Sequence, residues 1–186
     1  MNVELKLTSE DDGYVVKNLW PLYVHEVSEF ASFAPNAHGV LLDDESVETL
    51  AAQGETLAPW WRTPRWLFPY LILADGRPAG FNLISSGPYL PKGVELDFVV
   101  HEFFVLHAFR GRGVARAAAA QGFARHRGRW EVVTYPSHAR AIAFWRRAGG
   151  AATATGECFE AELDHPWGRK VVFRFDNRDG SAASAP

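Results

Sequence analysis

The chain contains stretches in which every second residue is apolar and stretches in which apolar residues recur at every third or fourth position. The first pattern predicts β-strands and the second predicts α-helices. The long, nearly continuous apolar stretch of residues 95–106 predicts a central strand covered on both faces. Asp75-Gly76 is typical of a hairpin turn between two strands. The strands expected are 3–8, two within 66–87, 95–106, 130–135, and a hairpin-like pair at 154–165 and 169–177.

Helical spacing of apolar residues defines the other elements. Residues 10–33 show this spacing, but Pro21 predicts an interruption of the helix. Residues 43–55 begin with acidic residues and end near a glycine, features that mark the two ends of a helix. The helices expected are therefore 10–33, 43–55, one that begins near Val114, and 137–150, with a loop at 58–66 because of its two prolines.

This order of elements predicts an α+β fold, an α/β three-layer sandwich in which helices flank a mixed, mostly antiparallel and twisted sheet. A length of 186 residues suits one domain, which we assign to residues 1–176. Residues 177–186 are mostly small and polar, so we expect a disordered C-terminal tail.

The composition of the chain indicates the cellular compartment in which we expect the protein. No apolar stretch approaches the roughly 18 residues of a membrane-spanning helix, so we expect no membrane partner. The first residues lack the basic and apolar regions of a signal peptide. Cys158 is the only cysteine, which excludes an internal disulfide and fits a reducing compartment. We therefore expect a cytoplasmic protein, and we expect no metal site.

Charge is distributed unevenly along the chain. The formal net charge is −3, yet residues 110–147 contain nine arginines and one acidic residue, a local charge of +8. A basic segment within an acidic chain indicates a local anion site rather than a general nucleic-acid surface. Nucleic-acid binding is the weaker alternative, because the interleaved aromatic and basic residues of single-strand binders are missing.

The sequence FRGRGVA, residues 109–115, joins the central strand to an alanine-rich helix. The first amides of a helix lack intrahelical acceptors, and the helix dipole adds positive charge there. Gly111 and Gly113 let the backbone curl around a ligand with no Cβ in the way. We therefore expect a phosphate or pyrophosphate. The Lys-Ser/Thr of a nucleotide-hydrolysing P-loop and the third glycine of a dinucleotide fingerprint are both missing.

Arg110–Ala115 resembles the Arg/Gln-x-x-Gly-x-Gly/Ala signature of the GNAT acetyltransferase superfamily, and EFFVLHAF stands where that family has its fourth strand. The segment HARAIAFWRRAGG resembles the family's Asn-x-x-Ala-x-x-Phe-Tyr helix, with matches at Ala141 and Phe144. The order of elements agrees over about residues 3–175, and the Phe-Trp pair resembles a bacterial subgroup of acetyltransferases. The resemblance implies a GNAT-like acyl-CoA N-acyltransferase fold.

The resemblance also implies acetyl-CoA as co-substrate. The main chain of Phe104, Val105 and Leu106 would hold the pantetheine arm like an added strand, with the Val105 amide as oxyanion donor. Amides of the glycine turn would hold the pyrophosphate, and Arg110 and Arg112 would supply charge. The residues implied in cofactor binding are Phe104, Val105, Leu106, Arg110, Gly111, Arg112, Gly113, Val114, Ala115, His138, Ala141, Phe144 and Trp145.

The implied activity is direct transfer of an acetyl group to a primary amine of a small molecule or peptide. Glu102 is the candidate base, because a carboxylate inside an apolar strand is costly to bury. Strict alternation puts His101 and Glu102 on opposite faces unless a bulge intervenes. Trp145 replaces the family's tyrosine acid, and an indole cannot deliver a proton. The catalytic candidates are therefore Glu102, Tyr135 and His138, with water as a further proton source.

Two upstream segments are candidates for the acceptor pocket. Tyr23, Glu26 and Glu29 lie in LYVHEVSEF, where the carboxylates could attract a cationic amine. Trp60, in APWWRTPRW, could stack on a substrate. The alternatives are solvated acids, a tryptophan that covers the core, and a Glu102 carboxylate that is only structural. A non-catalytic acyl-CoA-binding module is the alternative function, and a homodimer stays open.

Overall fold

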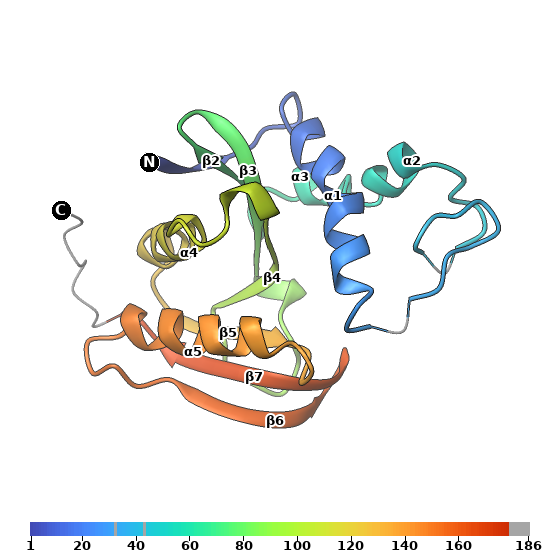
Figure 1. The fold of residues 1–186 in the computed structure, drawn as a ribbon. Coiled ribbons are helices and arrows are strands. Elements are labelled where there is room, and N and C mark those ends of the chain that lie inside the picture. The colour runs from blue at the N-terminus through green and yellow to red at the C-terminus, as the bar shows by residue number, and fades with distance from the viewer. Residues whose placement is uncertain (32, 43, 179–186) are drawn as a thin grey trace.

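One seven-stranded sheet runs through the computed structural model, which describes residues 1–31, 33–42 and 44–178 (Figure 1). The strand order is β1-β2-β3-β4-β5-β7-β6, and every pairing is antiparallel except the one between β4 and β5. The predicted α+β fold with a mixed, mostly antiparallel sheet is confirmed. The strands are β1 Val3–Leu7, β2 Leu67–Ala74, β3 Arg77–Ser86, β4 Phe98–Val105, β5 Arg129–Thr134, β6 Phe159–His165 and β7 Gly168–Asp176.

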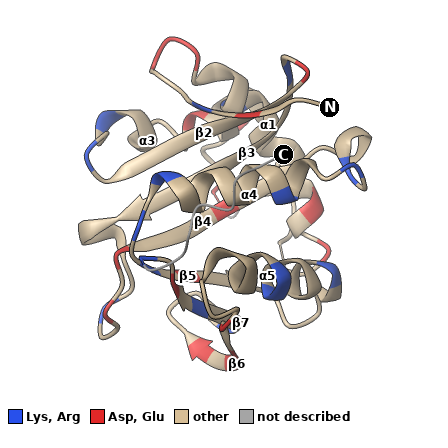
Figure 2. Ribbon diagram, turned by 90° about the vertical axis from the view of Figure 1, so that its left-hand side faces the viewer, with Lys and Arg blue, Asp and Glu red and all other residues tan. Residues whose placement is uncertain are grey.

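Helices cover both faces of the sheet and form the outer two layers (Figures 1 and 2). The N-terminal helices pack on a core that contains Leu71, Phe81 and Phe104, whereas α4 and α5 pack on a core that contains Val105 and Trp130. We call these the α1 face and the α4 face. The helices are α1 Tyr14–Val27, α2 Leu50–Glu55, α3 Pro59–Arg62, α4 Val114–Arg125 and α5 Ala139–Ala152, with 3₁₀ turns η1 Gly87–Tyr89 and η2 His107–Phe109.

The predicted interruption at Pro21 is wrong, because α1 continues through it. A proline inside a helix leaves the carbonyl four residues earlier, here that of Lys17, without its usual donor. That carbonyl faces α2, where a Cβ at Gly54 would lie 2.8 Å from its oxygen. The two backbones therefore approach closely at this point, which places the freed carbonyl inside a helix contact.

Two N-terminal predictions need further correction. Only the last residues of the expected helix 43–55 are helical, since α2 begins after Thr49, whose Oγ1 accepts from the Ala52 amide at 3.1 Å. Asp44 forms a local turn with Ser46 instead, and Asp43 lies outside the described residues. Part of the expected loop 58–66 is α3, because proline is well suited to the first turn of a helix.

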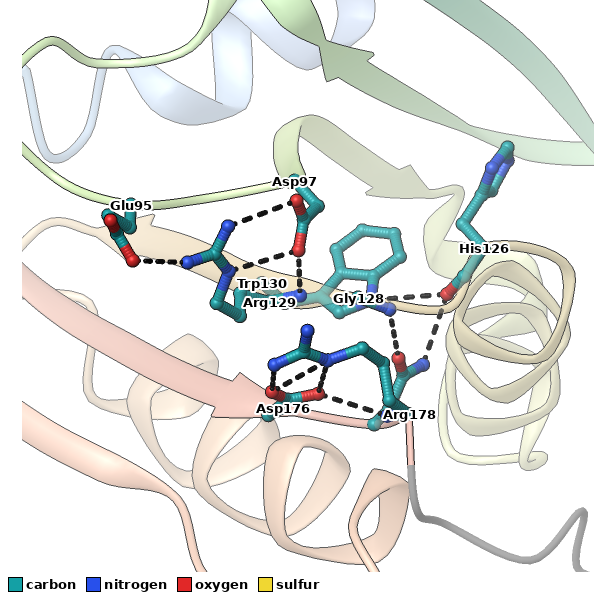
Figure 3. A network of polar contacts seen from close by, with 9 residues as sticks. Glu95, Asp97, His126, Gly128, Arg129, Trp130, Asp176 and Arg178 are labelled. Atoms are coloured by element: carbon teal, nitrogen blue, oxygen red, sulfur yellow. Dashed lines mark hydrogen bonds and ion pairs between the residues drawn. The ribbon is translucent and has the colours of Figure 1, made fainter.

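The start of β5 is tied to the segment before β4 by a polar network (Figure 3). The Arg129 amide donates to Asp97 Oδ2 at 2.8 Å, and the Arg129 guanidinium contacts the same carboxylate and Glu95. Asn177 accepts from the Gly128 amide at 2.8 Å. Asn177 is buried, so the expected disordered tail does not include it, and residues 179–186 lie outside the described part. The network pins β4 and β5 together at one end.

Candidate functional site

β4 and β5 separate at the end opposite to this network. Their pairing joins Phe98–Val100 to Trp130–Val132, while β4 continues to Val105 paired only with β3. The Leu106 amide donates to Ala79 at 2.8 Å, so the main chain of Leu106 is bound to β3. Adjacent residues of a strand point their amides in opposite directions, which turns Val105 toward the opening. Of the three residues expected to hold a pantetheine arm, Val105 therefore presents its amide there.

A β-bulge shapes the α1 face of β4. Leu83 of β3 pairs with Glu102, but the next residue, Ile84, pairs with Val100, so His101 is an extra residue in the ladder. The bulge puts His101 and Glu102 on the same face, where simple alternation would separate them. The His101 ring lies 5.5 Å from the ring of Trp60, and Glu102 contacts Tyr23 on α1. Trp60 itself is buried in the core of this face.

Glu102 is held through one of its two oxygens. The Tyr23 hydroxyl donates a hydrogen bond to Oε2, while Oε1 lies 3.7 Å from His101 Nδ1. Burial and the Glu102 charge raise the pKa of Tyr23 well above its usual value, so its hydroxyl stays a donor. The Glu102 side chain remains 24% exposed. Oε1 is thus a positioned acceptor that can take a proton from a ligand.

Tyr135 and Lys170 lie on the same face, next to Glu102. Trp130 and Val132 face α4, so by alternation Tyr135, just after β5, turns to the α1 face. Burial and the Glu102 charge raise the pKa of Tyr135. Lys170 Nζ lies 3.6 Å from the centre of the Tyr135 ring, which is a cation–π contact. Burial lowers the pKa of Lys170, against the opposing effect of Glu102.

The β6–β7 turn brings an aromatic wall to this face. The Trp167 ring lies 4.9 Å from His101 and 4.8 Å from His165. Neither Lys170 nor Trp167 was predicted from the sequence. The available signal was a lysine at an inward position of an alternating strand, and the position becomes informative only when β7 is placed beside β5.

The glycine turn has the geometry expected of an anion site. Gly111 and Gly113 have φ values of +72° and +80°, and an added Cβ would meet nothing within 4 Å at either position. No side chain caps the start of α4, whose first intrahelical bond runs from Ala117 to Gly113. The amides of Val114 and Ala115 therefore precede the helical bonds and are available to an anion.

The two arginines of the turn lie in different environments. Arg110 Nε donates to the Val105 carbonyl at 2.6 Å, and its Nη2 is bound to Glu26 on α1. Arg112 is exposed, and it belongs to no ion pair of the described chain. Arg110 therefore ties α1 to the end of β4, and Arg112 is the arginine that can reach a ligand.

Several predicted residues meet at a cavity of about 230 Å³ beside the glycine turn. Its lining includes Glu26, Glu29, Phe30, His107, Arg110 and His138. The His138 ring stacks on Phe30 at 4.0 Å between centres, and burial lowers the pKa of His138 against the opposing effect of Glu26. Glu26, Glu29 and His138 thus line this cavity, while Tyr23, Glu102 and Tyr135 do not, although the Glu26 charge still contributes to raising the pKa of Tyr23.

The remaining predicted residues lie on α5, against the α4 face of β4. Trp145 is buried, with its ring edge-on to Phe103 at 5.1 Å, and the Phe144 ring stacks on Phe103 at 5.7 Å. Ala141 packs against the same core. The indole at position 145 is therefore part of the core, as its apolar surface favours.

Two observations complete the site. Within residues 1–31, 33–42 and 44–178, no group of three His, Cys, Asp or Glu residues could hold a metal ion, and no helix is long and apolar enough to cross a membrane.

A second cavity, of about 560 Å³, lies near the start of β4 and the end of α4. Trp66, Phe68, Phe98 and His126 line it.

The sequence of residues 34–150 matches the model of the acetyltransferase (GNAT) family. No curated protein sequence matches the chain. Among solved structures, a GNAT-family acetyltransferase from Desulfovibrio desulfuricans is 16% identical, with a TM-score of 0.59, over 95% of this chain and 99% of that one. The ribosomal-protein-S5-alanine acetyltransferase from Vibrio fischeri is 13% identical, with a TM-score of 0.59, over 97% and 96%.

The aminoglycoside acetyltransferase AAC(6')-Ib in complex with coenzyme A is 18% identical, with a TM-score of 0.62, over 95% of this chain and 96% of that one. At these identities the likeness to solved structures shows a shared fold, and that fold includes proteins solved with coenzyme A bound.

Proposed function

The chain belongs to the GNAT acetyltransferase family, and on that premise we propose that it transfers the acetyl group of acetyl-CoA to the primary amine of a small molecule or peptide. The observation that carries the proposal is the arrangement around the free end of β4. An open amide at Val105, an uncapped helix start after Gly113 and a positioned carboxylate at Glu102 meet there.

Acetyl-CoA would be held mainly by main chain. The pyrophosphate would lie on the amides at the start of α4, with Arg112 as the nearby cation, because glycine at 111 and 113 leaves this surface open. The pantetheine arm would extend along the free edge of β4 beside Val105. The α5 residue Phe144 stacks on Phe103 of this strand, and Ala141 packs against the same core.

The reaction would then proceed by direct attack. Glu102 Oε1 accepts a proton from the ammonium form of the acceptor, and the neutral amine attacks the thioester carbonyl. The C–N bond forms, and the Val105 amide stabilises the oxyanion. The C–S bond then breaks as the carbonyl reforms, the nitrogen loses its remaining extra proton to solvent water to give the neutral amide, and the leaving thiolate takes a proton from a donor that solvent reprotonates, while Glu102 releases its proton to solvent. Removing an oxyanion donor of this kind typically raises the barrier by roughly 3 kcal/mol.

Tyr135 is better suited than His138 to protonate the thiolate. Burial lowers the pKa of His138, so its ring is neutral near pH 7, and it is stacked on Phe30 in the cavity beside the glycine turn. The raised pKa of Tyr135 keeps its hydroxyl protonated, on the same face as Glu102. We assign Tyr135 as the proton donor, and His138 as a residue that shapes the cavity.

The two alternative functions predict different behaviour of the protein. A binding module would be stabilised by CoA without turnover. Nucleic-acid binding is less favoured, since Arg110, Arg129 and Arg146 of the basic segment already form ion pairs with Glu26, Asp97 and Glu160.

The test measures thermal stabilisation by CoA together with release of free thiol from acetyl-CoA in the presence of a panel of amines. CoA at 100 times its dissociation constant should add about 2.7 kcal/mol of stability. Stabilisation with thiol release supports the proposal. Stabilisation without release from any amine favours the binding module, and no stabilisation at millimolar CoA contradicts the cofactor assignment.

A further inference from the structure

Lys170 is a buried lysine that feels the charge of Glu102 but has no carboxylate of the described residues within ion-pair distance. Its relative exposure is 6%, and no ion pair of the described chain includes it. A buried charge normally has a partner, because removing it from water is costly. Glu131 shows the usual solution on the same sheet, where Arg174 Nε lies 2.7 Å and His165 Nε2 lies 3.1 Å from its two oxygens. The burial of Glu131 is thus explained by its two partners, whereas the burial of Lys170 is not explained by an ion pair.

Lys170 and Glu102 face the same region without pairing with each other. Each lies near Tyr135: the Lys170 ammonium is over the ring, and the Glu102 charge raises the pKa of the phenol. Tyr23 occupies Oε2 of Glu102, and His101 Nδ1 lies 3.7 Å from Oε1, beyond hydrogen-bond distance. Among the described residues, the α1 face thus presents a carboxylate oxygen without a hydrogen bond and a lysine ammonium, and these two groups are farther apart than an ion-pair distance.

The third feature of this region is aromatic. Trp167 is 39% exposed, and the side chain of His101, against which it packs, is 35% exposed. Trp167 thus packs on His101, whose Nδ1 lies 3.7 Å from Glu102 Oε1. Exposed aromatic surface of this kind favours an apolar or aromatic group on a ligand.

We propose that the acceptor is a free amino acid, whose carboxylate binds Lys170 while its amine is delivered to Glu102. A zwitterion supplies the anion that Lys170 lacks and the cation that Glu102 can deprotonate, and it presents its side chain to Trp167 and His101. The inference rests on the proposed acetyl transfer. It also gives Lys170 the role of a binding residue for the acceptor and leaves the cofactor site unchanged.

The first experiment uses the wild-type protein and matched acceptors. Each amino acid is compared with the amine that lacks its carboxylate: phenylalanine with phenethylamine, tryptophan with tryptamine, histidine with histamine, and lysine with cadaverine. For the best amino acid, kcat/KM should exceed that of its matched amine by about 10- to 100-fold, the typical effect of one hydrogen-bonded ion pair. Most of the difference should appear in KM.

The second experiment removes the cation. In Lys170→Met the selectivity ratio, kcat/KM for the amino acid over that for its amine, should fall to near one. Lys170→Arg should keep the preference for the amino acid. Lys92→Met is the matched control, because Lys92 is an exposed lysine on the loop before β4, and its selectivity ratio should equal that of the wild type.

Each outcome decides the matter. Amines acetylated as well as the matched amino acids, or a selectivity ratio unchanged in Lys170→Met, would overturn the inference and leave acetyl transfer standing. If no acceptor is acetylated although CoA stabilises the protein, the proposed function fails and the inference fails with it. If Lys170→Met does not fold, the comparison of matched acceptors in the wild type and in Lys170→Arg still decides.

Discussion

The two halves of the site are built in different ways. The proposed cofactor half is one continuous stretch, residues 105–115, and it would act mainly through main-chain amides and two glycines with positive φ. The acceptor half is assembled from side chains of α1, β4, β5 and β7, namely Tyr23, Glu102, Tyr135 and Lys170. The first half is fixed by local backbone shape, and the second depends on how four distant segments are placed.

Because of this difference, we expect that single mutations can change cofactor binding and acceptor chemistry separately. A site that binds mainly through main chain should depend more on backbone shape than on the charge of any one side chain. A side-chain site should respond to single changes of charge without loss of cofactor affinity. The predictions that follow use this contrast, beginning with the largest effect.

Replacing Glu102 with Gln should lower kcat by about 10²- to 10⁴-fold, the usual contribution of a general base. The shape of the side chain and its contact with the Tyr23 hydroxyl are kept, but its basicity is lost. Affinity for CoA should stay within a few-fold. Steady-state kinetics of both proteins over a range of pH measure the effect.

In the wild type the rate should fall on acidification, and this limb should be missing in Glu102→Gln. Glu48→Gln, a change of an exposed carboxylate, is the control and should behave as the wild type. A Glu102→Gln protein with most of its activity and an unchanged pH profile would show that the carboxylate is structural.

Replacing Gly113 with Val should lower CoA affinity by about 10²- to 10³-fold, equivalent to the loss of two hydrogen bonds to a charged group. The side chain would occupy the surface that the pyrophosphate needs, and a β-branched residue is also strained at a φ of +80°. Gly156→Val separates these causes, because Gly156 has a φ of +75° and an equally open Cβ position far along the chain. Calorimetric titration with CoA should show the loss in Gly113→Val alone, whereas both variants lose stability.

Replacing the two arginines of the turn should change different quantities, the folding stability for Arg110 and the CoA affinity for Arg112. Arg110→Met removes the tie between Glu26 and Val105, so unfolding free energy should fall by roughly 1–2 kcal/mol with little change in CoA affinity. Arg112→Met should lower CoA affinity by about tenfold and leave stability unchanged. Urea unfolding and CoA titration of both variants measure this. The reverse pattern would indicate that Arg110, and not Arg112, contacts the cofactor.

The smallest expected effect is a loss of folding stability as the pH is lowered. Burial lowers the pKa of His126 to about 4, while an unfolded histidine titrates near 6.5. The unfolded state therefore binds more protons between these values, so stability is complete above about pH 6.5 and declines as pH falls toward 4. After allowance for partial exposure, the loss should be about 1 kcal/mol. Urea unfolding at pH 7 and pH 5 should show this loss in the wild type and a smaller one in His126→Gln.

The contrast between the halves also explains what the sequence could predict. The glycine turn, the central strand and the hairpin at Asp75-Gly76 depend on local backbone preferences, so their positions could be read from the sequence. The bulge at His101 could not, since it appears only in the pairing of β4 with β3. Lys170 was missed for the same reason, because β7 lies beside β5 only after the chain has folded.

Other errors came from contacts between distant segments. Pro21 was expected to interrupt α1, and the close contact of Lys17 with Gly54 could not be foreseen. The contact of Arg110 with Glu26, 84 residues away in sequence, was likewise not foreseen, and the expectation that Arg110 supplies charge to the pyrophosphate stays a prediction.

The central claim is that the cofactor lies along the free edge of β4 and on the turn before α4. Amide hydrogen exchange with and without CoA tests it most directly, because the main chain itself is the proposed binding surface. CoA should slow exchange in peptides that cover residues 103–117 and leave the β6–β7 hairpin unchanged. Slowed exchange at residues 65–98, around the second cavity, with no change at 103–117, would contradict the account.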